Sequence, residues 1–357
     1  MEMDSRLGNS LTSKLTKNLR KILEAIFNSL PEPTPVYSQW WFSKSIYGTL
    51  VKFISDISTH QNSIAFLGSP TLGALFSQCS NSPVHIFDID NVLLERISPY
   101  CSKPTRIIPY NVSDEIDNSF KGTFQIVFAD PPWTSSSLRS FLIRSSTLVS
   151  VGGTLAISFP QLFTRPAIRS ERKKLRKLAS KAGLSLKSIF HSFTEYSVPL
   201  FEYKAYKRCG INLKKPWRKG DLFIFTKIHD ASIDSTNLIS ANSKWDQYLH
   251  GKRRLFLKRD GLFEDGSPFA EPILGVEDFM YNSTSTRMHS WKSASFISTR
   301  NRIAHAYGRK EFSALLQRAF KDYKRTHKNN RFSSLTMPLE VKKVISDMLE
   351  IDKSSNL

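Results

Sequence analysis

Five short apolar runs between positions 63 and 159 constrain the fold more strongly than any other feature of the sequence. In order they read SIAFLG, VHIFDID, TRIIPYNV, FQIVFADPP and GTLAISF, with helix-length segments between them. Runs of this kind fit strands that are buried on both faces, which occur where helices cross over between parallel strands. Two further strand candidates follow at 185–194 and 221–228. The pattern predicts a doubly wound, seven-stranded, Rossmann-like α/β sheet with a late hairpin.

The N-terminal region has a different character. Residues 1–35 are expected to contain a basic amphipathic helix, because Leu15, Leu19 and Leu23 recur at helical spacing. The prolines at 31, 33 and 35 end that helix, since proline cannot continue one. The aromatic segment Trp40-Trp41-Phe42 follows, and it either covers a ligand or packs in the core.

The α/β pattern occupies residues 36–229, which we expect to form one domain. A stretch rich in Ser, Asn and Asp at 230–242 then predicts a linker. Residues 243–357 are expected to form a basic C-terminal module whose last part is helical, at 311–323 and 339–349.

The chain carries a formal net charge of +20, and the charge is unevenly distributed. Residues 161–219 contain 16 Lys and Arg against three acidic residues. Excess positive charge of this density attracts a polyphosphate backbone, although a solvated basic face without a partner is the simpler alternative. Nucleic acid, either RNA or DNA, is therefore the favoured partner, and a protein partner subunit is compatible with the sequence.

Three further features bear on the setting of the chain. No apolar run approaches the roughly 18 residues of a membrane span, and the N-terminus has no apolar signal-peptide core. Cys79, Cys101 and Cys209 are scattered without metal-ligand spacing. We expect no metal site and an intracellular location, cytoplasmic or, in a eukaryote, nuclear.

Ligands of an open parallel sheet bind at the carboxyl ends of its strands. Gly68 and Gly73 follow the first run and let the backbone approach a nucleoside closely, although a simple strand-to-helix turn would use the same residues. Asp88 ends the second run and can accept both hydroxyls of a ribose, whereas Asp90 is placed to cap the next helix. The candidate cofactor-binding residues are Gly68, Ser69, Pro70, Gly73, Asp88 and Asn111.

The fourth run leads directly into Asp130-Pro131-Pro132-Trp133, the most specific feature of the chain. A carboxylate and a carbonyl whose direction is fixed by proline can accept the two N–H groups of an amine. This arrangement leaves the nitrogen lone pair exposed to an electrophile, while an aromatic ring stacks on a planar base. The alternative is a proline turn, which the position after a buried strand makes less favoured. These four residues are the candidate catalytic loop.

The order of glycine loop, acidic strand end and Asp-Pro-Pro-Trp resembles the amino-methyltransferases. Among them the chain is similar to the probable N6-adenine methyltransferase-like group, which includes relatives that methylate lysine. Ser-Gln-Trp-Trp-Phe upstream and Ser69-Pro70 in place of a second glycine support this resemblance. It implies the class I methyltransferase fold and the cofactor S-adenosylmethionine, and it does not extend beyond residue 230.

Residues 63–160 also resemble the branched-chain polyamine synthases, through Phe87-Asp88-Ile89-Asp90 and the Asp-Pro-Pro-Trp-Thr segment. Those enzymes carry an acidic Gly-Asp-Asp-Asp cluster where this chain has Gly68-Ser69-Pro70-Thr71. Without those carboxylates an aminopropyl ammonium would lack its counter-charge. Methyl transfer is therefore favoured over aminopropyl transfer.

Two basic segments are candidates for phosphate contacts, although each would also suit a solvated surface. One is a predicted helix at 169–181, and the other interleaves cations with an aromatic ring at 214–219. The candidate nucleic-acid-binding residues are Arg172, Lys173, Lys174, Arg176, Lys177, Lys214, Lys215, Trp217, Arg218 and Lys219. The favoured substrate is adenine N6 in RNA or DNA. Protein lysine, and a non-catalytic nucleic-acid-binding subunit, are the next alternatives.

One further pattern, Arg300-Asn301 followed by His305, resembles the Arg-Asn-x3-His motif of the HEPN ribonucleases. That resemblance would require a helix that presents both Arg and His, with the histidine as a general base. The preceding sequence lacks the long helices of that fold, so we expect His305 to be an ordinary residue.

Overall fold

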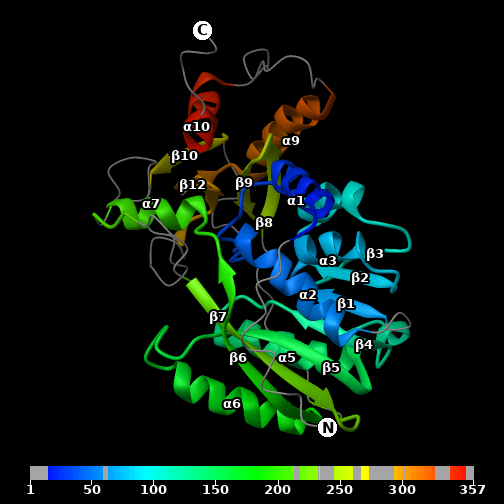
Figure 1. Cartoon of the computed structure of the whole chain (residues 1–357). Coiled ribbons are helices and arrows are strands. Elements are labelled where there is room, and N and C mark those ends of the chain that lie inside the picture. The colour runs from blue at the N-terminus through cyan, green and yellow to red at the C-terminus, as the bar shows by residue number, and fades with distance from the viewer. Residues whose placement is uncertain are drawn as a thin grey trace. The chain divides into compact units, whose positions relative to one another are not determined.

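The computed structural model describes residues 15–58, 63–208, 210–212, 218–231, 233, 245–259, 267–272, 293–300, 302–325 and 338–350 (Figure 1). The chain divides into two compact units. Unit 1 contains Met1–Leu30, Trp41–Ser197 and Pro216–Ala241, and unit 2 contains Pro31–Trp40, Val198–Lys215 and Asn242–Leu357.

All seven predicted strands form one sheet in unit 1, in the order β3-β2-β1-β4-β5-β7-β6 (Figure 1). Adjacent strands are parallel except at β7, which runs antiparallel to both β5 and β6. The predicted doubly wound sheet with a late hairpin is therefore confirmed. Its strands are β1 (Ile64–Leu67), β2 (Val84–Asp88), β3 (Arg106–Pro109), β4 (Phe124–Ala129), β5 (Val149–Pro160), β6 (Leu184–Tyr196) and β7 (Arg218–Lys227).

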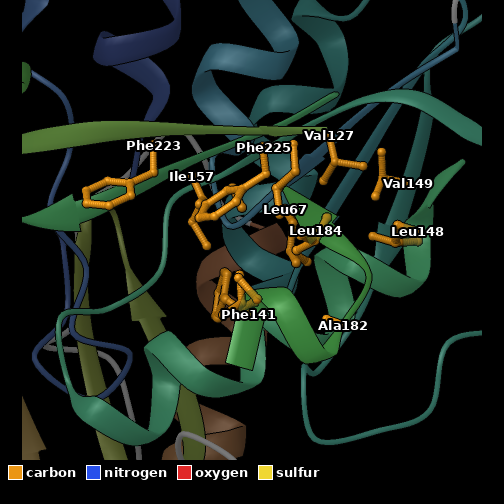
Figure 2. Packing of buried hydrophobic residues seen from close by; sticks show 14 of the residues in the cluster. Leu67, Val127, Phe141, Leu148, Val149, Ile157, Ala182, Leu184, Phe223 and Phe225 are labelled. Atoms are coloured by element: carbon orange, nitrogen blue, oxygen red, sulfur yellow. The ribbon is translucent and has the colours of Figure 1, made fainter. Parts of the chain in front are cut away.

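One face of this sheet is covered by helices α5 (Ser135–Leu148) and α6 (Ile168–Lys181). Because side chains alternate across a strand, Leu67, Val127 and Ile157 project to the same side. Phe141 from α5 and Ala182 at the end of α6 lie among the buried side chains of that cluster (Figure 2). The continuous apolar runs of the sequence are explained by this burial, since the alternate residues face a second helical layer.

The opposite face packs against α2 (Tyr47–Ile57) and α3 (Pro70–Ser77). The Phe66 ring of β1 contacts Phe76 of α3, with 5.7 Å between the ring centroids, and Phe42 packs against Phe128 of β4 at 6.3 Å. None of the helices in the described part of the chain is long and apolar enough to cross a membrane. The other helices of the unit are α1 (Lys17–Ser29), α2 (Tyr47–Ile57), α3 (Pro70–Ser77) and α4 (Asn91–Ile97), with short 3-10 turns η2 (Lys44–Ile46), η3 (Ser98–Tyr100) and η4 (Asn118–Phe120).

Unit 2 contains a five-stranded antiparallel sheet that the sequence pattern did not predict, in the order β10-β12-β11-β9-β8. The two predicted C-terminal helices are confirmed. Leu257 and Phe296 from the sheet share a buried cluster with Phe312 and Ile345 from these helices. The elements are α7 (Leu200–Arg208), β8 (Trp245–His250), β9 (Arg253–Lys258), β10 (Phe269–Pro272), β11 (Phe296–Ser298), β12 (Ile303–Tyr307), α9 (Arg309–Arg325) and α10 (Leu339–Leu349).

The resemblance to HEPN ribonucleases is wrong at the level of local structure. His305 lies in strand β12, paired in register with Glu271 of β10. A strand cannot present Arg and His along one helical face, as that motif requires. Asn301 lies outside the described residues.

The unit boundaries differ from the predicted domains 1–35, 36–229 and 243–357. Helix α1 packs against α3 and α4, and the Ser29 hydroxyl donates to the Arg96 carbonyl at 3.4 Å, so this helix belongs to the α/β unit. Residues 31–40 instead belong to unit 2, where Val36 is buried together with Trp245 and Phe256. These contacts join segments far apart in the sequence, which local patterning cannot reveal.

Candidate active site

Backbone hydrogen bonds hold the ends of three parallel strands together. The Gly68 N–H donates to the Phe87 carbonyl at 2.9 Å, and the Asp130 N–H donates to the Leu67 carbonyl at 3.0 Å. The glycine loop after β1, the acidic end of β2 and the proline loop after β4 therefore lie along one edge of the sheet. The three strand ends singled out in the sequence converge as predicted.

Gly68 is required by its backbone and by its neighbours. Its φ of +70° lies in the left-handed region that residues with a Cβ seldom adopt. A Cβ built there would lie 2.6 Å from Cε1 of Phe141 and 3.0 Å from the Asp130 carbonyl oxygen. The missing side chain thus allows the proline loop to pass close to the end of β1.

Gly73 serves a different purpose from the predicted one. It lies inside helix α3, and a Cβ there would meet Cγ1 of Ile86 in β2 at 2.9 Å. The glycine lets the helix pack closely on the sheet. The sequence analysis had instead proposed Gly73 as a cofactor-binding residue. Pro70 is the first residue of the same helix, where its missing N–H is tolerated.

The remaining cofactor candidates form a polar rim at this edge. The Ser69 side chain is 3 % exposed, and its hydroxyl has no hydrogen-bond partner among the described residues. Asp88 Oδ1 accepts the Asp90 N–H at 2.9 Å, and Asn111 Oδ1 accepts the Ser113 N–H at 3.1 Å. A buried hydroxyl without a partner costs free energy unless a ligand satisfies it, so this rim fits a polar nucleoside such as that of S-adenosylmethionine.

Asp90 has the structural role predicted for it. Its carboxylate accepts the N–H of Leu93 at 3.2 Å and caps helix α4. The two acidic residues at the end of β2 therefore have different environments, with Asp90 buried at 1 % exposure and Asp88 half-buried.

Asp130 has the most perturbed carboxyl group of the rim. Burial raises its pKa from 3.8 to about 7, although the Tyr196 hydroxyl, the Arg218 guanidinium and the Ser158 hydroxyl each act to lower it. The Tyr196 hydroxyl donates to Asp130 Oδ1 at 2.5 Å. A carboxyl group with this pKa exchanges its proton near neutral pH and can accept hydrogen bonds when ionised.

A chain of hydroxyl groups supports Asp130 from β5 and β6. The Tyr196 hydroxyl lies 2.8 Å from Ser158 Oγ, which in turn lies 3.0 Å from Thr194 Oγ1. The Tyr196 ring packs on Phe42 with 5.0 Å between centroids. Sequence analysis missed Tyr196 and Ser158. Their positions depend on pairing across β5, β7 and β6, where the β6 register shifts between Phe190 and Thr194.

Trp133 is less available for base stacking than the sequence suggested. Its side chain is buried at 9 % exposure, and the Arg218 guanidinium lies 4.1 Å from the ring centroid. The Tyr196 ring meets it edge-on at 5.4 Å. One face of the indole is therefore occupied by a cation–π contact, and Arg218, a predicted nucleic-acid-binding residue, lies beside the proline loop.

Arg165 ties the proline loop to the start of α6, a role that sequence analysis missed. Its Nη1 donates to the Trp133 carbonyl at 2.7 Å, and its Nε donates to Glu171 Oε2 at 3.1 Å. Directly after the loop, the Thr134 hydroxyl accepts the Ser137 N–H at 3.2 Å and caps helix α5. The C-terminal end of the loop is thus anchored by polar contacts to α5 and to the start of α6.

The nucleic-acid-binding candidates fall into distinct groups. Arg172 was wrongly assigned to the surface: its side chain is 8 % exposed and forms a buried ion pair with Asp221. Lys219 is exposed and lies 3.6 Å from Glu195. The four other α6 candidates, Lys173, Lys174, Arg176 and Lys177, are exposed as predicted, and Lys214, Lys215 and Trp217 lie outside the described residues.

Comparisons with known proteins place this site in context. Residues 35–196 match the family model described as "Probable N6-adenine methyltransferase", which is less than half of the chain. No curated protein sequence matches the chain significantly.

Several solved structures are similar to the chain at low sequence identity. The branched-chain polyamine synthase of Thermus thermophilus, in complex with N4-aminopropylspermidine and 5′-methylthioadenosine, is 13% identical with a TM-score of 0.56, over 63% of this chain and 68% of that one. Its C9 mutein gives 13% and 0.54 over the same shares. A TehB-like SAM-dependent methyltransferase from Corynebacterium glutamicum is 14% identical, with a TM-score of 0.34 over 50% of this chain and 86% of that one.

The matched segment contains the glycine loop, the Asp88 strand end, the proline loop and Tyr196. It also contains six of the seven strands of the sheet, and the strand order is that of the predicted class I fold. Over residues 35–196 the chain is thus similar to the family described as "Probable N6-adenine methyltransferase", and its sheet has the class I methyltransferase fold.

Proposed function

We propose that this chain transfers a methyl group to the exocyclic N6 amine of adenine in RNA or DNA. The observation that carries the proposal is Asp130, a carboxylate with a pKa near 7 at the end of β4, held by Tyr196 beside the polar rim of Ser69 and Asp88. The family match favours an adenine amine. The net charge of +20 favours a polyanion as its carrier.

The residues of the rim would hold the cofactor and present the amine. Ser69, Asp88 and Asn111 would bind S-adenosylmethionine, whose sulfonium supplies an electrophilic methyl group. The Asp130 carboxylate and the Pro131 carbonyl would each accept one N–H of the target amine, so that its lone pair points toward that methyl group.

Proton transfer follows from the same geometry. Methylation would give the target nitrogen a positive charge and make its N–H groups acidic. Asp130 would take the surplus proton. Its pKa of about 7 lies near neutral pH, where general-base catalysis by this group would be efficient. The hydrogen bond from the Tyr196 hydroxyl to Oδ1 fixes the orientation of the Asp130 carboxylate.

A labelled-methyl assay tests the proposal. The full chain is incubated with methyl-tritiated S-adenosylmethionine and with separate preparations of total RNA, DNA and protein. We expect label in adenine of one nucleic acid, lost in Asp130→Ala and retained in Glu95→Ala, which removes an exposed carboxylate on α4. Digestion to nucleosides and chromatography of N6-methyladenosine and its deoxy form identify the acceptor.

Other outcomes would replace the proposal. Label that remains on protein after nuclease treatment would favour lysine methylation. Production of 5′-methylthioadenosine from decarboxylated cofactor and a polyamine would favour aminopropyl transfer, an activity suggested by the fold shared with the polyamine synthase. Absence of cofactor binding by calorimetry would favour a non-catalytic nucleic-acid-binding subunit.

A further inference from the structure

The segment after β5 starts at the candidate active site. In the β4–β5 pairing, Ala129 lies opposite Ile157, so Ser158 is beside Asp130 at the carboxyl edge. The chain leaves β5 at Pro160 and reaches Arg165, whose guanidinium donates to the Trp133 carbonyl at 2.7 Å. Residues 161–165 therefore form a segment next to the proline loop.

Phe163 differs from the other residues of segment 161–165 in its exposure and its backbone conformation. It is 87% exposed and has a φ of +76°, a conformation that a bulky residue seldom adopts. Its neighbour Leu162 is 37% exposed. A solvent-facing turn with positive φ would be more stable with glycine, so stability of the unit does not account for this aromatic side chain.

The helix that follows this segment, α6, adds positive charge. Arg169, Lys173 and Lys177 on α6 are all exposed and spaced four residues apart, which places them on successive turns. The buried side of the helix is fixed to the sheet by the ion pair of Arg172 and Asp221. The exposed cations thus form a stripe that matches the charge of a phosphate backbone.

We propose that Phe163 stacks on the base next to the target adenine, while the Arg169, Lys173 and Lys177 stripe binds the phosphates of the same strand. This inference rests on the proposed function and specifies its substrate: a strand whose bases are unpaired at the site. Stacking on an exposed ring requires a base that is free of its partner, and it is tolerant of sequence because every base has a π-face.

The experiment uses a 12-nucleotide uridine strand with one adenosine and the fluorescent base 2-aminopurine on its 5′ or 3′ side. Binding to the full chain is followed by anisotropy, and stacking is followed by quenching of 2-aminopurine. A blunt duplex of the same sequence is the comparison ligand. We expect the single strand to bind more tightly and one of the two probes to be quenched.

Variants separate stacking from folding. Phe163→Ala should weaken single-strand binding by about 5- to 150-fold, which is the range measured for the loss of one stacked base. The same substitution should abolish quenching. Phe163→Trp should retain both. Phe163→Gly should also lose binding, although it relieves the positive φ and should melt no lower than the parent. Val151→Ala removes an exposed apolar side chain near the other end of β5 and serves as the control.

The results distinguish the two proposals. If Phe163→Ala binds and quenches like the parent, or if the parent does not bind the strand, the stacking site is wrong even where methyl transfer to nucleic acid is observed. If the parent binds and quenches but transfers label to neither RNA nor DNA, the stacking site stands and the proposed function fails. Lys173→Gln should reduce the salt dependence of binding by about one counterion.

Discussion

Two carboxylates of the same sheet, Asp130 and Asp221, have opposite environments. Burial of Asp221 would raise its pKa, but hydrogen bonds from Arg172, the Ser192 N–H and His191 outweigh that effect and hold the pKa below its usual value. Asp130 is held by a neutral hydroxyl, with Arg218 as the nearby cation, and burial raises its pKa to about 7.

The difference separates a carboxylate that stabilises the fold, Asp221, from one that is available for catalysis, Asp130. Asp221 is fully compensated and joins α6 to β6 and β7, so its charge is fixed. Asp130 is undercompensated, which destabilises its ionised form and makes it responsive to a ligand with N–H groups to donate. A carboxylate that stays reactive near neutral pH is the one expected at a catalytic position.

The largest expected effect is the loss of catalysis when Asp130 is changed to Asn. The amide keeps the shape and can still accept from Tyr196, but it has no charge to hold the amine and no capacity to take a proton. We expect kcat to fall by about 100- to 1,000-fold, the range seen for removal of one transition-state contact. Single-turnover methyl transfer measures the change, and an undiminished rate would remove Asp130 from the mechanism.

Asp221→Asn should instead act on stability. The substitution leaves the Arg172 side chain, which is 8 % exposed, without its counter-charge. Breaking such a pair costs about 3 kcal/mol. Urea denaturation checks this value, and the double variant Arg172→Met with Asp221→Asn should recover part of the loss; equal stability of all three proteins would contradict the assignment.

Asp130→Asn should also stabilise the domain, with a defined pH dependence. The folded-state pKa of Asp130 is raised to about 7, so the folded chain binds more protons than the unfolded chain between pH 4 and 7. Stability is therefore lost as pH rises through this window, and the amide avoids that loss. We expect a gain of about 2 kcal/mol at pH 8, after allowance for the partial exposure of the group, that vanishes near pH 4.

The smallest effect is expected for Tyr196→Phe. The hydroxyl lowers the pKa of Asp130, so its removal should raise that pKa further. The acidic limb of kcat/KM, expected near pH 7 in the parent, should move to higher pH, with a rate loss of about tenfold at pH 7. A purely structural role for Tyr196 would lower the rate without moving the limb.

The sequence was sufficient to predict the sheet, but it did not identify every residue of the candidate active site. Asp130 and Asp88 could be identified because each ends a continuous apolar run, and strand ends converge in a parallel sheet. Tyr196 and Ser158 gave no such signal, because their contacts depend on the register of β5, β7 and β6. Arg172 shows the reverse error: its basic neighbours suggested a surface, but helical periodicity turns it inward.

The second unit was the larger omission. Its strands are only three to six residues long, so none forms an apolar pattern long enough to predict a strand from the sequence. The sheet forms because distant segments, such as Val36 and Phe256, bury their apolar side chains together. Only the two final helices had enough periodicity to be predicted.

The sequence by itself therefore determined the α/β class, the seven strands and the placement of Asp130-Pro131-Pro132-Trp133 at a strand end, because these follow from local hydrophobic patterning. The tertiary structure decided the chemistry of that loop. The pKa of Asp130, the contact of Arg218 with Trp133 and the hydroxyl chain through Tyr196 arise from burial and long-range pairing, which no single segment encodes.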